Sequence, residues 1–172
     1  MSQITDLTLA QLKQALDDGD LSSVEIITAF LDRIDSLNPE LNAFITITHE
    51  DAHKAAADAD AARAKGKASA FAGLPIAHKD LFCTDGTRTT CGSKMLSDFV
   101  APYDAHVVSR CPQAGLISLG KLTTAELFEL SLSFFRTNDY RRFPRQPVQR
   151  VPTQGRRYDH VVHILRGDKV TY

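Results

Sequence analysis

Helical and strand-like segments alternate along the first two thirds of the chain, and this alternation constrains the fold more than any other feature. Three short apolar segments, at 43–47, 74–78 and 116–120, are separated by longer segments with helical spacing or helix-forming composition. Short strands that alternate with helices are typical of an α/β sheet whose two faces are both covered by helices. The sequence therefore predicts an α/β fold.

The first two helices carry clear start and stop signals. Thr8 is placed to cap a helix that stops at Gly19. Ser22, with Glu25 three residues later, forms the pattern of a capping box, and apolar residues follow it at helical spacing. Because proline lacks a backbone N–H, we expect this second helix to end at Asn38–Pro39.

Later segments predict further helices. Residues 50–65 are rich in alanine, and another helix is expected to start near Asp104. Pro112 falls inside that segment, where a proline costs about 3 kcal/mol, so either the helix ends early or the proline burdens the fold. Thr123 and Glu126 have the spacing of one more capped helix.

Composition is that of an ordinary globular protein, with 43% hydrophobic and 24% charged residues among 172. That length suits one domain or a fragment of a larger one. Cys83, Cys91 and Cys111 are an odd number without metal-knuckle spacing, so they predict neither a disulfide framework nor a zinc knuckle. The N-terminus lacks a signal-peptide pattern, and no apolar run approaches the ~20 residues needed to cross a bilayer. A reducing, cytoplasmic location is expected.

The net charge of −1 conceals an uneven distribution. Residues 1–135 carry a clear acidic excess, whereas residues 136–172 hold nine basic and three acidic side chains. The segment 136–172 also contains several turn-forming residues and few apolar ones, too few to offset the entropy lost on ordering. We therefore expect 1–135 to be the folded part and 136–172 to be a poorly packed basic tail, either disordered or foreign to the fold.

Lys79 is the most informative single residue. It ends the otherwise apolar stretch FAGLPIAHKDLF, residues 71–82. Burying a lysine costs several kcal/mol unless it is paired or loses its proton, so either the strand has reached solvent or the amine lies in a site as a usable base. Because open α/β sheets place their sites at the C-terminal ends of strands, a site beside Lys79 is one of the two interpretations.

A literal HExxH motif spans residues 49–53 and would suggest a zinc hydrolase. Zinc needs a third protein ligand, and the position six residues after His53 that supplies it in the extended motif is Ala59. The acidic residues here also suit the first turn of a helix. We expect His49 and His53 to lie near the start of the alanine-rich helix, partly exposed and without metal.

Three stretches together carry a family resemblance: AGLPIAHKDLFCTDGTRTTCGSKML, FVAPYDAHVV and AGLISLGKL. They resemble the amidase signature family, and within it the A subunits of the glutamyl-tRNA(Gln)/aspartyl-tRNA(Asn) amidotransferases. The similarity extends over roughly residues 3–126. It implies the N-terminal part of an amidase-type mixed sheet with helices on both faces, left incomplete in this chain.

The resemblance also implies a catalytic role. In that family the lysine of this motif, here Lys79, is the base of a Ser–cis-Ser–Lys triad and must be neutral to act. The loop 84–93 would line the site. The family's Gly/Ser-rich serine motif is missing, because RVPTQGRRYDHVVHIL stands in its place and Ser131 and Ser133 fall in a helical pattern without a glycine-framed turn. The nucleophile is therefore unknown.

The function implied is that of an N-terminal fragment or variant of the glutamine-hydrolysing subunit. That subunit supplies ammonia to convert Glu-tRNA(Gln) or Asp-tRNA(Asn) to the amidated form. The resemblance implies the other subunits of the complex as partners, glutamine as substrate, indirect contact with tRNA, and no cofactor here, since ATP and Mg²⁺ belong to the partner subunit. The alternatives are a non-catalytic partner- or RNA-binding module and, more remotely, a zinc hydrolase.

Overall fold

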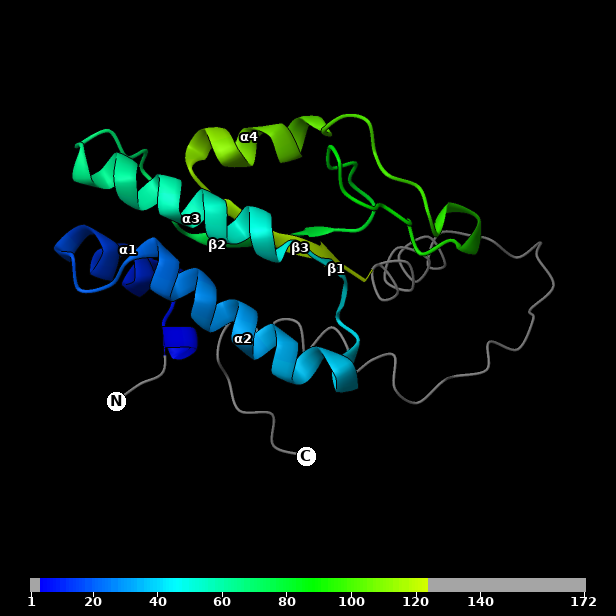
Figure 1. Ribbon diagram of the computed structural model, residues 1–172, viewed down its shortest axis with the longest axis horizontal. Coiled ribbons are helices and arrows are strands. Elements are labelled where there is room, and N and C mark those ends of the chain that lie inside the picture. Colours follow the sequence, from blue (N-terminus) through cyan, green and yellow to red (C-terminus); the bar gives the residue numbers. More distant parts are fainter. Residues whose placement is uncertain (1–3, 124–172) are drawn as a thin grey trace, which may run out of the picture.

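A computed structural model describes residues 4–123 of the chain (Figure 1). In chain order the elements are the short helix η1 (Ile4–Asp6), α1 (Leu9–Asp18), α2 (Ser23–Leu41), β1 (Phe44–Ile47), α3 (His49–Ala64), β2 (Pro75–Lys79), the short helix η2 (Lys94–Leu96), α4 (His106–Ala114) and β3 (Ile117–Leu122). The tail at 136–172, the helix expected from Thr123, and Ser131 and Ser133 lie outside the described residues.

The three strands form one mixed sheet in the order β1-β3-β2. The central strand β3 runs antiparallel to β1 and parallel to β2. In Figure 1 the strands lie between α4 on one side and α2 on the other. The prediction of a mixed α/β fold with a partial sheet is confirmed, and all three expected strands are present within two residues of their predicted bounds.

The predicted helix starts are also confirmed. Thr8 caps α1 by accepting a hydrogen bond from the Gln11 amide, and Gly19 ends it in the left-handed conformation at φ +79°. Ser22 and Glu25 form the expected capping box at the start of α2. These local signals work because they satisfy backbone N–H groups that the helix itself leaves unpaired.

The predicted end of α2 is wrong. The helix continues through Pro39 to Leu41 and is capped by Asn42, which adopts the left-handed conformation at φ +49° and donates its amide to the Asn38 carbonyl. The Asn38 side chain bonds both the amide and the carbonyl of Phe44, at 2.8 and 3.1 Å. Asn38 thus ties the last turn to β1, which holds the helix together past the proline.

Pro112 likewise lies inside its helix. α4 continues to Ala114 and ends at Gly115. The early ending is therefore excluded, and the proline remains as a burden, because it cannot donate the hydrogen bond that a regular helix would place there.

The core lies between the sheet and the helices α1, α2 and α3. Apolar residues from each of these helices and from the strands and their flanking residues contribute to one buried cluster: Leu12, Leu16, Ile26, Ile27, Phe30, Leu31, Ile34, Ala43, Phe44, Ala52, Ala56, Leu74, Ile117 and Leu119 are its buried members. The small alanines of α3 let that helix pack closely on α2. Asp60 of α3 then accepts hydrogen bonds from the first amides of α2, those of Ser23 and Val24.

One glycine sets the geometry of the central strand. Gly120 has φ +142°, and a Cβ added there would lie 2.1 Å from the carbonyl oxygen of Thr46 on β1. The pairing of β3 with both neighbours shifts register close to this point. Only glycine permits so close an approach, and the next residue, Lys121, is consequently carried into the interior.

Candidate functional site

Lys79 is the last residue of β2, paired in register with Leu122 of β3. It is partly buried, and its carbonyl accepts a hydrogen bond from the Phe82 amide at 3.0 Å, which turns the chain immediately after the strand. Within residues 4–123 its ammonium has no hydrogen-bond or ion-pair partner. The position of Lys79 at the end of a strand agrees with the position predicted from the sequence, whereas its role as a base stays a prediction.

The next residue, Asp80, is completely buried. Its Oδ2 accepts hydrogen bonds from both the amide and the hydroxyl of Thr90, and its carbonyl accepts the Cys91 amide at 3.1 Å. These bonds fold the segment that follows β2 back onto the end of the strand. The other carboxylate oxygen, Oδ1, is buried and has no hydrogen-bond partner among the described residues.

Lys121 of β3 is the residue that sequence reasoning missed. Its side chain is fully buried, and its ammonium donates to the Phe82 carbonyl and to the hydroxyls of Thr84 and Thr89, each of the latter at 3.1 Å. Burial lowers the pKa of Lys121, and the nearby Asp80 carboxylate opposes that shift. The sequence contains one indication of this role, because Lys121 directly follows a glycine inside the apolar run AGLISLGKL.

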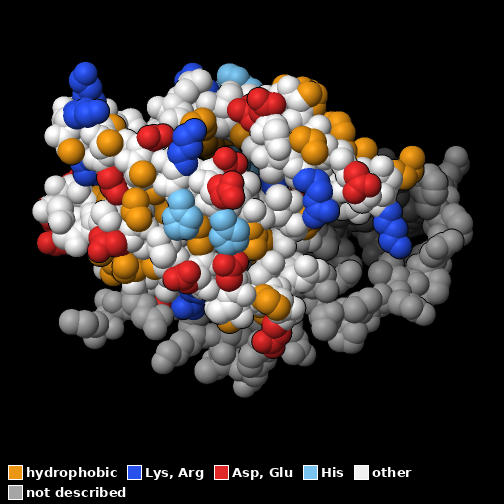
Figure 2. All heavy atoms as spheres, in the orientation of Figure 1, with side chains coloured by type: hydrophobic (Ala, Val, Ile, Leu, Met, Phe, Trp, Pro, Cys, Tyr) orange, Lys and Arg blue, Asp and Glu red, His pale blue; other side chains and the backbone are white. Residues whose placement is uncertain are grey.

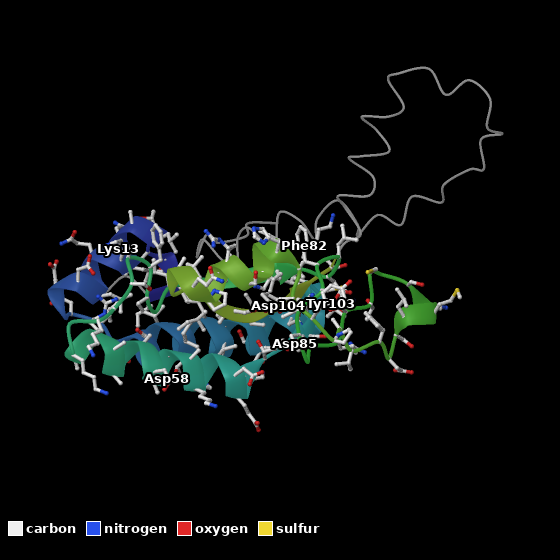
Figure 3. All side chains as sticks on the ribbon, turned by 90° about the horizontal axis from the view of Figure 1, so that it is seen from above. Lys13, Asp58, Phe82, Asp85, Tyr103 and Asp104 are labelled. Atoms are coloured by element: carbon white, nitrogen blue, oxygen red, sulfur yellow. The ribbon has the colours of Figure 1, made fainter. Side chains whose placement is uncertain are left out.

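The loop 84–93 is bonded to the end of β2 through Asp80, whereas its role in lining a catalytic site stays a prediction. Arg88 bonds the Ile45 carbonyl at 3.0 Å and forms an isolated antiparallel bridge with Val100. The Asp85 amide donates to Asp104 Oδ1 at 2.7 Å, which joins the loop to the start of α4. Figure 3 shows Asp85 and Asp104 close together at this end of the fold.

His78 lies on the neighbouring position of β2 and lines a hollow of about 260 Å³ between α3 and α4. It is 7% exposed, and burial lowers its pKa, as does the Lys121 charge, while Asp104 opposes the shift. The hollow also carries Asp51, Asp85 and Asp104, so three carboxyl side chains share its lining with the buried His78 imidazole.

The HExxH residues are placed as predicted. His49 is the first residue of α3, and its Nε2 lies 3.3 Å from Asp35 Oδ1. His53 is exposed one turn later in the same helix. Figure 2 shows exposed histidine side chains on the front face of the molecule. Among residues 4–123, no three His, Cys, Asp or Glu side chains are grouped so as to hold a metal ion. That His49 and His53 bind no zinc remains a prediction.

Comparison with known proteins identifies the family. The amidase family model matches residues 25–149. The chain belongs to the amidase signature family. The A subunit of glutamyl-tRNA(Gln) amidotransferase from Azoarcus sp. (strain BH72) is 60% identical over 119 residues, which are 69% of this chain and 24% of that protein. The protein of the same name from Coxiella burnetii (strain RSA 493 / Nine Mile phase I) is 48% identical over 147 residues, 84% of this chain and 30% of its own length.

Solved amidase structures share the fold. The peptide amidase of Stenotrophomonas maltophilia superposes with a TM-score of 0.66 at 32% identity, over 71% of this chain and 26% of its own. Fatty acid amide hydrolase, at 23% identity, matches in fold with a TM-score of 0.64 over 69% of this chain and 21% of its own. This chain thus spans about a quarter of the length of these relatives. No helix between residues 4 and 123 is long and apolar enough to cross a membrane.

Proposed function

We propose that this chain is the N-terminal part of the glutamine-hydrolysing A subunit of a tRNA-dependent amidotransferase, with Lys79 as its catalytic base. The 60% identity to the Azoarcus protein over residues that include the Lys79 motif carries the proposal. Support also comes from the position of Lys79 at a strand end, partly buried and without a polar partner in the described part of the chain. Open α/β sheets place their sites at the carboxyl ends of strands, which is where this amine lies.

In this proposal the neutral Lys79 amine accepts the proton of a nucleophilic serine through a bridging serine. The serine oxygen then bonds to the amide carbon of glutamine, and the C–N bond breaks as the departing nitrogen takes a proton to leave as ammonia. Water next releases glutamate from the serine ester. Ammonia passes to a partner subunit, which uses ATP and Mg²⁺ to amidate the glutamate or aspartate carried by tRNA in the cytoplasm. No cofactor is assigned to this chain.

The nucleophile must come from outside the described residues. Of the serines between residues 4 and 123, Ser22 and Ser93 cap helices and Ser69 donates to the Ala114 carbonyl, and none lies in the Gly/Ser-rich motif that carries the nucleophile in the family. A base without a nucleophile cannot form the acyl intermediate. We therefore expect the 172-residue chain alone to hydrolyse no glutamine.

A chimera tests the proposal. Residues 1–123 replace the matching segment of the Azoarcus protein, which is assembled with its own partner subunits, and amidation of Glu-tRNA(Gln) is measured with glutamine as the nitrogen donor. The expected result is activity within about tenfold of the native complex, because folds tolerate substitution when core patterning is kept. The control is the same protein lacking the segment, which should be inactive. An assembled but inactive chimera would contradict the proposal and favour the non-catalytic partner-binding module.

A further inference from the structure

Two lysines in contrasting surroundings lie at this edge of the sheet, Lys79 at the end of β2 and Lys121 near the end of β3. Lys79 is partly exposed and has no polar partner among residues 4–123, whereas Lys121 is fully buried and donates three hydrogen bonds. The two side chains come from adjacent parallel strands, whose pairing places Lys79 opposite Leu122, the residue after Lys121. The same pairing sets Lys121 against His78, so Lys79 and Lys121 extend toward opposite faces of the sheet, and of the two only Lys121 bonds the segment that follows β2.

The hydrogen bonds of Lys121 fit an ammonium ion. An ammonium has three N–H donors, and the three acceptors present are the Phe82 carbonyl and the hydroxyls of Thr84 and Thr89. A neutral amine would have only two N–H groups for these three oxygens. The Thr89 hydroxyl in turn donates to the Thr87 carbonyl at 3.2 Å, so its own hydrogen is already committed.

The acceptors all belong to one segment. Phe82, Thr84 and Thr89 lie in the turn and loop that follow Lys79, and Asp80 holds Thr90, the next residue of the same loop. The segment is therefore attached to the sheet by the Lys121 ammonium from β3 and by Asp80 at the end of β2, in addition to the bond from Arg88 to the Ile45 carbonyl of β1. Apolar contacts add little to this attachment, because the Leu81 and Phe82 side chains at its start are 54% and 38% exposed to solvent.

We propose that Lys121 is a positioning residue, a buried ammonium that holds residues 82–90 against the end of β2 beside Lys79 and keeps its own proton. Its consequence for glutamine hydrolysis rests on the proposed function, but the attachment of the loop does not. Charge-assisted hydrogen bonds in a buried site are among the strongest that a side chain forms. Removing the charge should release the loop while the helical core stays folded.

Hydrogen–deuterium exchange on the full 172-residue chain tests the attachment. Lys121→Met keeps the length of the side chain and removes its charge and donors. We expect amides in 82–90 to exchange at least about tenfold faster, because the loss of even one charge-assisted bond shifts local opening by that factor, while peptides from α2 are unchanged. Lys79→Met is the matched control, the same chemical change on the neighbouring strand, and should leave exchange in 82–90 within twofold of the native chain.

A second variant keeps the test decisive if Lys121→Met unfolds the whole chain. Thr84→Val with Thr89→Val removes two acceptors from the loop itself and leaves the lysine and the strand intact. Faster exchange confined to 82–90 supports the proposal. If peptides from α2 also exchange faster in Lys121→Met, that variant has lost its core, and the exchange of 82–90 in the threonine variant decides whether the proposal holds. Exchange in 82–90 within twofold of native in the threonine variant would overturn the proposal.

The catalytic consequence has its own readout in the chimera. Lys121→Met should lower kcat while the rise of activity with pH persists, because that rise reports the base, assigned to Lys79. Loss of that pH dependence would show that Lys121 itself titrates, which would refute the statement that it keeps its proton. Because the exchange experiment requires no activity, an inactive chimera would count against the proposed function and not against the attachment.

Discussion

Replacement of Asp60 by alanine should destabilise the fold by loosening α2 from α3. Asp60 Oδ1 accepts the Ser23 amide at 2.8 Å, and Oδ2 accepts the Val24 amide at 3.1 Å. These are the first two residues of α2, whose amides have no partner within the helix. A carboxylate from another helix therefore supplements the Ser22–Glu25 capping box, and its charge also complements the positive end of the helix dipole.

The expected magnitude follows from those two bonds. Hydrogen bonds to a charged group contribute about 1.5–3 kcal/mol each, and the loss of a helix cap costs about 0.5–2 kcal/mol. Asp60 is only partly buried, which favours the lower values, and alanine recovers about 0.5 kcal/mol through its better helix propensity. We expect Asp60→Ala to lower the free energy of unfolding by about 2 kcal/mol.

Urea unfolding followed by circular dichroism measures this change, with the midpoint shifting and the slope constant. Asp58→Ala is the matched control, since Asp58 is exposed on the same helix and forms no hydrogen bond or ion pair among residues 4–123 (Figure 3). It should change stability by less than about 0.5 kcal/mol. Equal midpoints for Asp58→Ala and Asp60→Ala would refute the stabilising role of the Asp60 bonds to the first amides of α2.

Three further outcomes are expected. Gly120→Ala should cost about 3 kcal/mol or more in urea unfolding, since its Cβ would lie 2.1 Å from the Thr46 carbonyl oxygen; near-native stability would contradict that close approach. Burial lowers the pKa of His78, so the unfolded chain binds protons first and stability should fall as the pH drops below about 6.5; His78→Gln should remove this dependence, and an unchanged profile would exclude it. Protein purified without added metal should hold no stoichiometric zinc by elemental analysis, whereas zinc that is lost in His53→Ala would establish a site at His49 and His53.

Local signals made much of the fold predictable. Thr8, Ser22 and Glu25 determine where helices start because their side chains bond amides within the same turn, so no distant contact is required. The prediction failed at Pro39, where the end of α2 depends on bonds between Asn38 and Phe44. Local helix rules cannot anticipate a bond that the next strand supplies.

The candidate site was only partly predictable for the same reason. Lys79 stands out because it follows an apolar strand directly, which is visible in the sequence. Lys121 acquires its role from acceptors more than thirty residues earlier in the chain, at Phe82, Thr84 and Thr89. A buried lysine in a strand is costly on its own, and only the folded loop supplies the partners that compensate its desolvation.

The most direct test of the central claim is glutamine hydrolysis by the chimera carrying Lys79→Ala. Loss of a triad member lowers kcat by a factor of about a thousand or more, whereas the matched change Lys54→Ala, on the exposed surface of α3, should leave turnover within twofold. Binding of the partner subunits should be the same for both variants. Turnover by Lys79→Ala equal to that by Lys54→Ala would contradict the assignment of Lys79 as the base.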